Sequence, residues 1–148
     1  MRLYRMSSCI VALALLLLTG CAVNKSSATV DPSANLAAIK RVHVVHQPED
    51  GRNVNQLIAE QLTKMGYSAT TSDAKPKDAK DVDAVVTYLD KWMWDLTMYM
   101  IELTIVIRDP ANDFPLATGN SLHTSLTRKS PKEMVEEVTT NIFKAGKP

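Results

Sequence analysis

Alternating side chains between residues 97 and 108 constrain the fold more than any other feature of this sequence. Every odd position from 99 to 107 is apolar, whereas the even positions mix methionine, threonine and valine with a glutamate and an arginine. Successive side chains of a β-strand point to opposite faces of a sheet. The period of two therefore predicts a strand with one face buried in a core.

Four other segments have the composition of strands. Residues 40–46 are rich in β-branched side chains and end at a turn cluster, and residues 67–71 form a second short segment. Residues 83–95 lie directly before the alternating strand. Residues 115–128 follow it after a turn that contains Pro110.

Two helices are predicted from apolar residues at helical spacing. The first runs from Asn53 to Met65, with Gly66 as its stop signal. The second begins at Ser130, where a proline at the first helical position and Glu133 at the third form a capping box. Its apolar stripe consists of Met134, Val138 and Ile142.

The predicted element order is β-α-β-β-β-α. A strand, a crossover helix and a second strand usually form a right-handed parallel pair. Each helix has one apolar stripe, and a sheet face is the natural surface to cover both stripes. We therefore expect an α+β domain over residues 39–148, a two-layer sandwich of a mixed sheet with two helices on one face.

The first 20 residues have the order of a secretory signal: Arg2 and Arg5, an apolar run over residues 9–18, then Thr19 and Gly20. The run is shorter than the roughly 20 apolar residues that a transmembrane helix needs. We therefore expect a cleaved signal peptide over residues 1–20.

Residues 18–21, Leu-Thr-Gly-Cys, resemble the lipobox of bacterial lipoproteins. The resemblance implies cleavage before Cys21 and a diacylglyceryl group on its thiol, which anchors the chain to a membrane. Ala22 stands where an aspartate favours inner-membrane retention in enterobacterial lipoproteins, so the resemblance implies a periplasm-facing anchor in the outer membrane. The alternative is an ordinary cleavage site, or an uncleaved anchor, that contains a cysteine.

Residues 21–38 follow as the lipidated N-terminus and a segment of small and polar side chains without a sustained period. We expect a flexible tether with a root-mean-square reach of roughly 20 to 25 Å. Cys9 would leave with the signal, so no free thiol would remain for a disulfide or a metal site. The 17 basic and 16 acidic side chains give no electrostatic footprint for nucleic acid.

No catalytic residue, metal site or cofactor is expected. Asp90 and Glu102 could lie opposite each other, but an exposed pair bridged by Arg108 or Arg128 is the commoner outcome. His43 and His46 would point to opposite faces of one strand, and His123 stands alone. Residues 119–121, Gly-Asn-Ser, lack the flanking glycines and the strand-to-helix turn of a nucleophile elbow.

The stretch Trp-Met-Trp-Asp-Leu-Thr-Met-Tyr-Met over residues 92–100 is the candidate binding surface. A hairpin turn at residues 95–97 would pair Trp94 with Met98, Trp92 with Met100, and Asp90 with Glu102. The numbers of each pair add up to an even value, so odd positions of both strands would face the helices. The opposite face would carry Tyr88, Trp92, Trp94, Met98 and Met100.

Such a face is too apolar to be left in water. The chain itself could cover it, with the segment around Leu36 and Ile39 or the loop at 72–81. Another protein could cover it, either a second copy or an envelope partner, because large apolar patches mark interaction sites and tryptophan is favoured there. Contact with a membrane is the third explanation.

The element order over residues 40–146 resembles small, uncharacterised outer-membrane lipoproteins with a TolB N-terminal-like sandwich. Cys21 is the one position that the resemblance carries over. It favours a non-enzymatic accessory lipoprotein that docks on an envelope protein through the face around Trp92 and Trp94. The alternatives are a carrier of a small apolar or lipid ligand and a homodimer that uses the same face.

Overall fold

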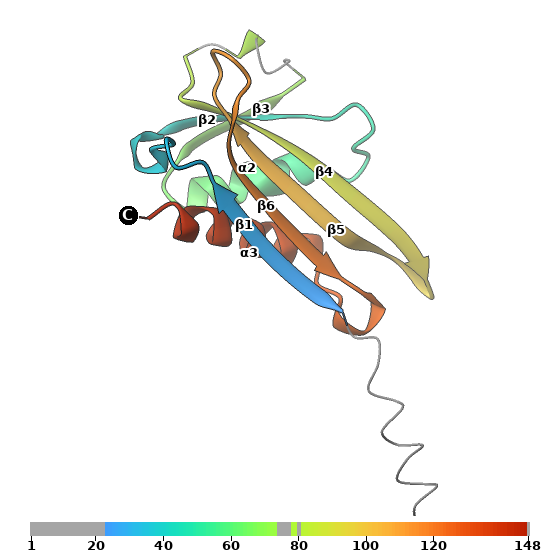
Figure 1. Cartoon of the computed structure of the whole chain (residues 1–148). Helices are drawn as coiled ribbons and strands as arrows, with labels where there is room; N and C mark the ends of the chain where they lie inside the picture. Colours follow the sequence, from blue (N-terminus) through green and yellow to red (C-terminus); the bar gives the residue numbers. More distant parts are fainter. Residues whose placement is uncertain (1–22, 74–77, 80, 148) are drawn as a thin grey trace, which may run out of the picture.

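A six-stranded sheet with two helices on one face forms the protein (Figure 1). The structure is a computed structural model that describes residues 23–73, 78–79 and 81–147. The strands are β1 (Asn24–Val30), β2 (Arg41–Val45), β3 (Ser68–Ser72), β4 (Ala84–Asp95), β5 (Thr97–Arg108) and β6 (Pro115–His123). The helices are α2 (Val54–Lys64) and α3 (Pro131–Ala145), with short 3-10 turns η2 (Leu36–Ala38) and η4 (Ser125–Thr127).

The sheet is mixed, and its strand order is β1-β6-β5-β4-β2-β3. The strand β2 lies between β3 and β4 and is parallel to both, whereas β4, β5, β6 and β1 form an antiparallel series. The helix α2 connects the parallel pair β2 and β3. The predicted α+β sandwich, with both helices on one sheet face, is confirmed.

The core lies between the two helices and the sheet. The helices contribute Ile58, Leu62, Met134, Val138 and Ile142, and the sheet contributes Val44, Val86, Leu103, Ile105 and Ile107. Each is at most 2% exposed, and full burial of such a side chain contributes roughly 1.5–3 kcal/mol. The capping box predicted at Ser130 and Glu133 begins α3 as expected.

The predicted tether is wrong where the structure describes it. Residues 24–30 form β1, and all seven pair with β6. Leu36 and Ile39 are buried in the core, and a side chain added at Gly146 would lie 2.6 Å from Leu36 Cδ1. Leu36 thus lies beside the end of α3, whereas residues 92–100 lie beside its start, so this segment does not cover them.

The predicted signal peptide and Cys21 lie outside the described residues. Within the part of the chain that the structure describes, no helix has the length and apolar character to cross a membrane.

The hairpin of β4 and β5 follows the predicted register only near its turn. Trp94 pairs with Met98 and Trp92 with Met100, as predicted. The next pair is Lys91 with Glu102, so Ile101 is an extra residue on β5 and forms a β-bulge. From this bulge onward, the numbers of paired residues add up to an odd value.

Because of the bulge, the predicted assignment of side chains to the two sheet faces is partly wrong. Beyond the bulge, odd positions of β5 face the helices as predicted, but in β4 the even positions Val86 and Tyr88 share that face. Trp92 and Trp94 continue the even face of β4, and their partners Met100 and Met98 lie on it with them. The prediction that this face points away from the helices is therefore wrong. Asp90 does not pair with Glu102: it accepts a hydrogen bond from Trp92 Nε1 at 2.5 Å. Glu102 forms an ion pair with Lys91 at 2.6 Å instead of a bridge through an arginine.

Candidate interaction surface

The five predicted binding residues separate into exposed and buried groups. Trp94 is 71% exposed and Met98 is 46% exposed at the hairpin tip. Met100 is fully buried at the base of a groove beside the start of α3, and Tyr88 is buried in the core. Trp92 is half-buried between them. The tip is therefore the part of the predicted surface that other molecules can reach.

Tyr88 has a structural role rather than the predicted binding role. Its hydroxyl donates a hydrogen bond to Asp50 Oδ2 at 2.7 Å, and the Gln47 backbone N–H donates to it at 3.3 Å. Burial, followed by the hydrogen bond to Asp50, raises the pKa of the Tyr88 hydroxyl. Asp50 also accepts the backbone N–H of Asn55, so Tyr88 connects β4 to the beginning of α2.

Trp92 is engaged within the chain on two sides. The guanidinium of Arg52 lies 4.1 Å from the centroid of its ring, a cation–π distance. Its indole N–H donates to Asp90. Trp92 therefore joins the loop before α2 to β4, and Trp94 is the more accessible tryptophan.

The exposed tip belongs to a larger cluster that we call the apolar end. It consists of Val23, Met93, Trp94, Leu96, Met98 and Leu126, six of the eight large exposed hydrophobic side chains in the described chain. Leu96 is 88% exposed and Leu126 is 78% exposed. Figure 1 shows the tip of β4 and β5, the turn after β6 and the start of β1 at the same end of the sheet.

Hydrogen bonds through η4 hold the three parts of the apolar end together. On one side, the Thr127 hydroxyl donates to the Val23 carbonyl at 3.1 Å. On the other, Arg128 Nη1 donates to Thr97 Oγ1 at 2.9 Å and Nη2 donates to the Asp95 carbonyl at 3.2 Å. The same guanidinium stacks over Tyr99, with its carbon 4.5 Å from the centroid of the ring. The end is therefore a connected unit and not three separate loops.

Leu96 forms the hairpin turn in the left-handed backbone region, with φ of 56°. The other non-glycine residues with positive φ in the described chain are Asn53, Asp81 and Asp113. Asparagine and aspartate tolerate this region, whereas a leucine there costs roughly 1–2 kcal/mol. Leu96, the most exposed large hydrophobic residue of the described chain, thus occupies a backbone conformation that disfavours leucine.

A shallow groove adjoins the apolar end between the hairpin and the start of α3. Its volume is about 310 Å³. Lining it are Trp92, Met98, Met100, Arg128 and Pro131, among others. The groove is apolar on its hairpin wall and basic on its opposite wall.

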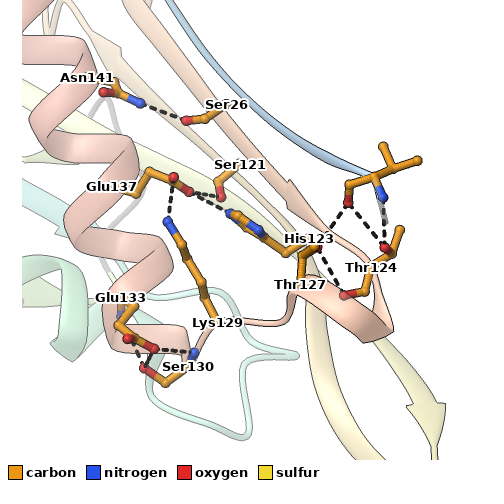
Figure 2. A network of polar contacts seen from close by, with 11 residues as sticks. Ser26, Ser121, His123, Thr124, Thr127, Lys129, Ser130, Glu133, Glu137 and Asn141 are labelled. Atoms are coloured by element: carbon orange, nitrogen blue, oxygen red, sulfur yellow. Dashed lines mark hydrogen bonds and ion pairs between the residues drawn. The ribbon is translucent and has the colours of Figure 1, made fainter. Parts of the chain in front are cut away.

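A polar network around Glu137 ties α3 to β6 (Figure 2). Lys129 Nζ donates to one carboxylate oxygen at 2.6 Å. The Ser121 hydroxyl at 2.6 Å and His123 Nε2 at 2.8 Å both contact the other oxygen. Burial alone would raise the pKa of Glu137, but these hydrogen bonds outweigh it and lower the pKa to about 2.

The network does not have the arrangement of a nucleophilic site. Ser121 and His123 both contact Glu137 and not each other, whereas an activated serine is hydrogen-bonded to its base. Both side chains are also buried. Elsewhere, His43 contacts Thr70, and His46 contacts Asp73. The described residues contain no group of three or more potential metal ligands.

Solved structures with the same architecture are distant in sequence. The PelC L103M dodecamer from Paraburkholderia phytofirmans has a TM-score of 0.61 and 14% identity, over 80% of this chain and 97% of that chain. A DUF4136 family protein from Bacteroides thetaiotaomicron has a TM-score of 0.51 and 9% identity, over 82% of this chain and 95% of that chain. TolB from Acinetobacter baumannii has a TM-score of 0.50 and 15% identity, over 84% of this chain and 31% of TolB.

These comparisons establish the fold. They confirm the sandwich that the predicted TolB-like resemblance implied. No protein-family model matches the chain, and no sequence match to a curated protein is significant.

Sequence reasoning found Trp94 and Met98 but missed Val23, Leu96 and Leu126. The missed side chains come from three segments that only the fold brings together. Leu96 carried a local signal, because an apolar residue in a hairpin turn is unusual where glycine, asparagine and aspartate are preferred.

Proposed function

We propose that this chain is a periplasmic accessory lipoprotein that works by binding and not by catalysis. It docks on another component of the cell envelope through the apolar end. The observation that carries this proposal is the concentration of exposed Trp94, Leu96 and Leu126 in one place, because monomeric proteins rarely leave such clusters unused. A fold shared with TolB and a DUF4136 family protein is compatible with this role.

The membrane anchor in this proposal is an acylated Cys21 in the outer membrane. Two or three acyl chains, at about 0.8 kcal/mol per buried methylene, give stable attachment where one chain does not. We expect purified protein to have the mass of a chain that begins at acylated Cys21. Cys21→Ala should move the protein from the membrane fraction to the soluble fraction. An unacylated wild-type chain in the membrane fraction would contradict the proposed anchor.

Photo-crosslinking in cells tests docking. A benzophenone amino acid at Leu96 should form adducts, and the same probe at Phe114 should form few. Phe114 is the control because it is also an exposed large hydrophobic residue, at 46%, and lies in the turn at the other end of β5 and β6. An adduct with a different protein would support the envelope partner predicted from the sequence, and a doubled mass would indicate a homodimer. Equal labelling at both positions would refute docking through the apolar end.

A second candidate function is transport of a small apolar or lipid ligand. The observation that favours it is the groove beside the apolar end, whose walls include Met98, Met100 and Arg128. A lipid tail could lie along the methionines with its head group near the arginine. Native mass spectrometry of protein released from detergent would show a bound lipid if this candidate is correct, and only bare protein if it is not.

A further inference from the structure

The apolar end lies where the chain leaves the domain toward Cys21. We infer that this end inserts into the same lipid surface that holds Cys21, so that the domain is fixed to the membrane at two points. The inference rests on the proposed function and specifies the envelope component on which the apolar end docks. The first point is the acylated cysteine, and the second is the hairpin tip with Leu126 beside it.

The position of Val23 supports this arrangement. Val23 precedes β1 and is bound to the turn after β6. The Thr124 backbone N–H donates to the Val23 carbonyl at 3.1 Å, and the Val23 N–H donates to Thr124 Oγ1 at 3.2 Å. Cys21 precedes Val23 by two positions, a reach of at most about 7 Å of extended chain. An anchor at Cys21 therefore brings the domain to the membrane with this end first, and little free chain separates the two.

The chemistry of the apolar end suits a lipid interface. Tryptophan is enriched at the level of the head groups, where its ring is apolar and its N–H remains solvated. Leu96 and Leu126 project from two separate turns. Leu96 is 88% exposed and Leu126 is 78% exposed. Lipid chains accommodate such projections without a matching cavity, whereas a protein partner would need a separate pocket for each.

The charges at this end permit insertion. Asp95, the carboxylate of the hairpin turn, accepts a hydrogen bond from Ser125 and forms an ion pair with Arg128 at 3.4 Å. Arg128 and Lys129 follow η4 directly, so two basic side chains lie beside the tip. The tip therefore does not bring an unpaired carboxylate to the membrane.

The conformation of Leu96 is a second, independent observation. A turn with φ of 56° that served only to connect two strands in water would favour glycine or asparagine. Leucine weakens the fold there and exposes its side chain. A residue that strains the free domain and projects from it is explained when its side chain is buried elsewhere.

Tryptophan fluorescence tests the inference, because the chain contains two tryptophans. Acylated Trp92→Phe retains Trp94 at the tip, and acylated Trp94→Phe retains Trp92, which lies about 7 Å farther along the strand. Each variant is placed in phosphatidylethanolamine and phosphatidylglycerol vesicles that carry bromine on the upper acyl chain. We expect loss of most Trp94 emission and little change for Trp92. Trp94 emission that is quenched by aqueous acrylamide and not by brominated lipid would overturn the inference.

Leu96→Asn separates insertion from folding. Asparagine tolerates positive φ, so this variant should unfold at the same or a higher temperature while brominated lipid quenches Trp94 less. Unchanged quenching would remove Leu96 from the inserted surface and contradict the inference.

Vesicle flotation distinguishes failure of the inference from failure of the proposed function. Protein that floats through its acyl chains but shows no quenching of Trp94 retains the anchor and refutes insertion. A protein adduct at position 96 in cells, together with absent quenching, would assign the apolar end to a protein partner. Wild-type protein that is unacylated and does not float would refute the anchor itself.

Discussion

Replacement of Glu137 by leucine should lower the free energy of unfolding by about 3 kcal/mol, because removal of one partner from a buried ionic network leaves the others uncompensated. Ser121 is fully buried and His123 is 3% exposed, so neither can replace the lost carboxylate with bulk water. Lys129 can turn to solvent, which places the expected loss at the lower end of the range for buried pairs. Urea unfolding monitored by circular dichroism measures the change.

Glu136→Leu is the matched control for this prediction. Glu136 neighbours Glu137 on α3 but is exposed. Leucine and glutamate have similar helix propensities, so we expect a change within about 0.5 kcal/mol. Equal effects of the two substitutions would show that the network around Glu137 contributes nothing specific.

The same carboxylate gives a pH dependence with a defined sign. The pKa of Glu137 is lowered from 4.5 in the unfolded chain to about 2 in the folded protein. Its contribution to stability is therefore present above the unfolded pKa and is lost as the pH falls from about 5 to 2. Wild type and Glu137→Leu should become more similar in stability over this interval. A difference that stays constant from neutral pH to pH 2 would contradict the assigned role.

Gly119→Ala should destabilise the fold by about 1–3 kcal/mol through overpacking. Gly119 lies in β6 beneath α3, and an added Cβ would be 2.7 Å from Val138 Cγ1 and 2.7 Å from Ile142 Cγ1. Both neighbours are β-branched residues in a helix and have little rotamer freedom with which to withdraw. The close approach of β6 to α3 thus requires glycine at this position. Thermal and urea unfolding measure the loss.

Two further variants separate overpacking from other effects of the substitution. Gly51→Ala should be nearly neutral, because a Cβ there meets no atom within 4 Å. In a double-mutant cycle, Val138→Ala should offset part of the cost of Gly119→Ala, with a coupling of about 0.5–3 kcal/mol. Strictly additive effects would show that the steric contact with Val138 does not cause the destabilisation.

Local sequence signals predicted most of the elements. The period of two in β5, the apolar spacing in α2 and the capping box of α3 each depend on neighbouring residues, so the sequence shows them directly. The strand β1 is different. Its seven residues are mostly small and polar, and a ladder of backbone hydrogen bonds to β6, nearly 100 positions away in the chain, holds it in place.

The bulge at Ile101 explains why the candidate surface was only partly predicted. An extra residue in one strand reverses the facing of every residue beyond it, and Ile101 continues the apolar alternation as if the strand were regular. Tyr88, Trp92 and Trp94, which share the even face of β4, were therefore all assigned to the face away from the helices. Trp94 and Met98 lie on the turn side of the bulge, so their predicted pairing holds although their predicted face does not.

The pairing of β1 with β6 also has a mechanical consequence. A pull on the N-terminus acts along the axis of β1, and the hydrogen bonds to β6 run perpendicular to that axis. The load is then a shear that the seven paired residues share, and not a peeling force that opens one bond after another. The first strand of the sheet should therefore resist a force applied at its start better than an unpaired segment would.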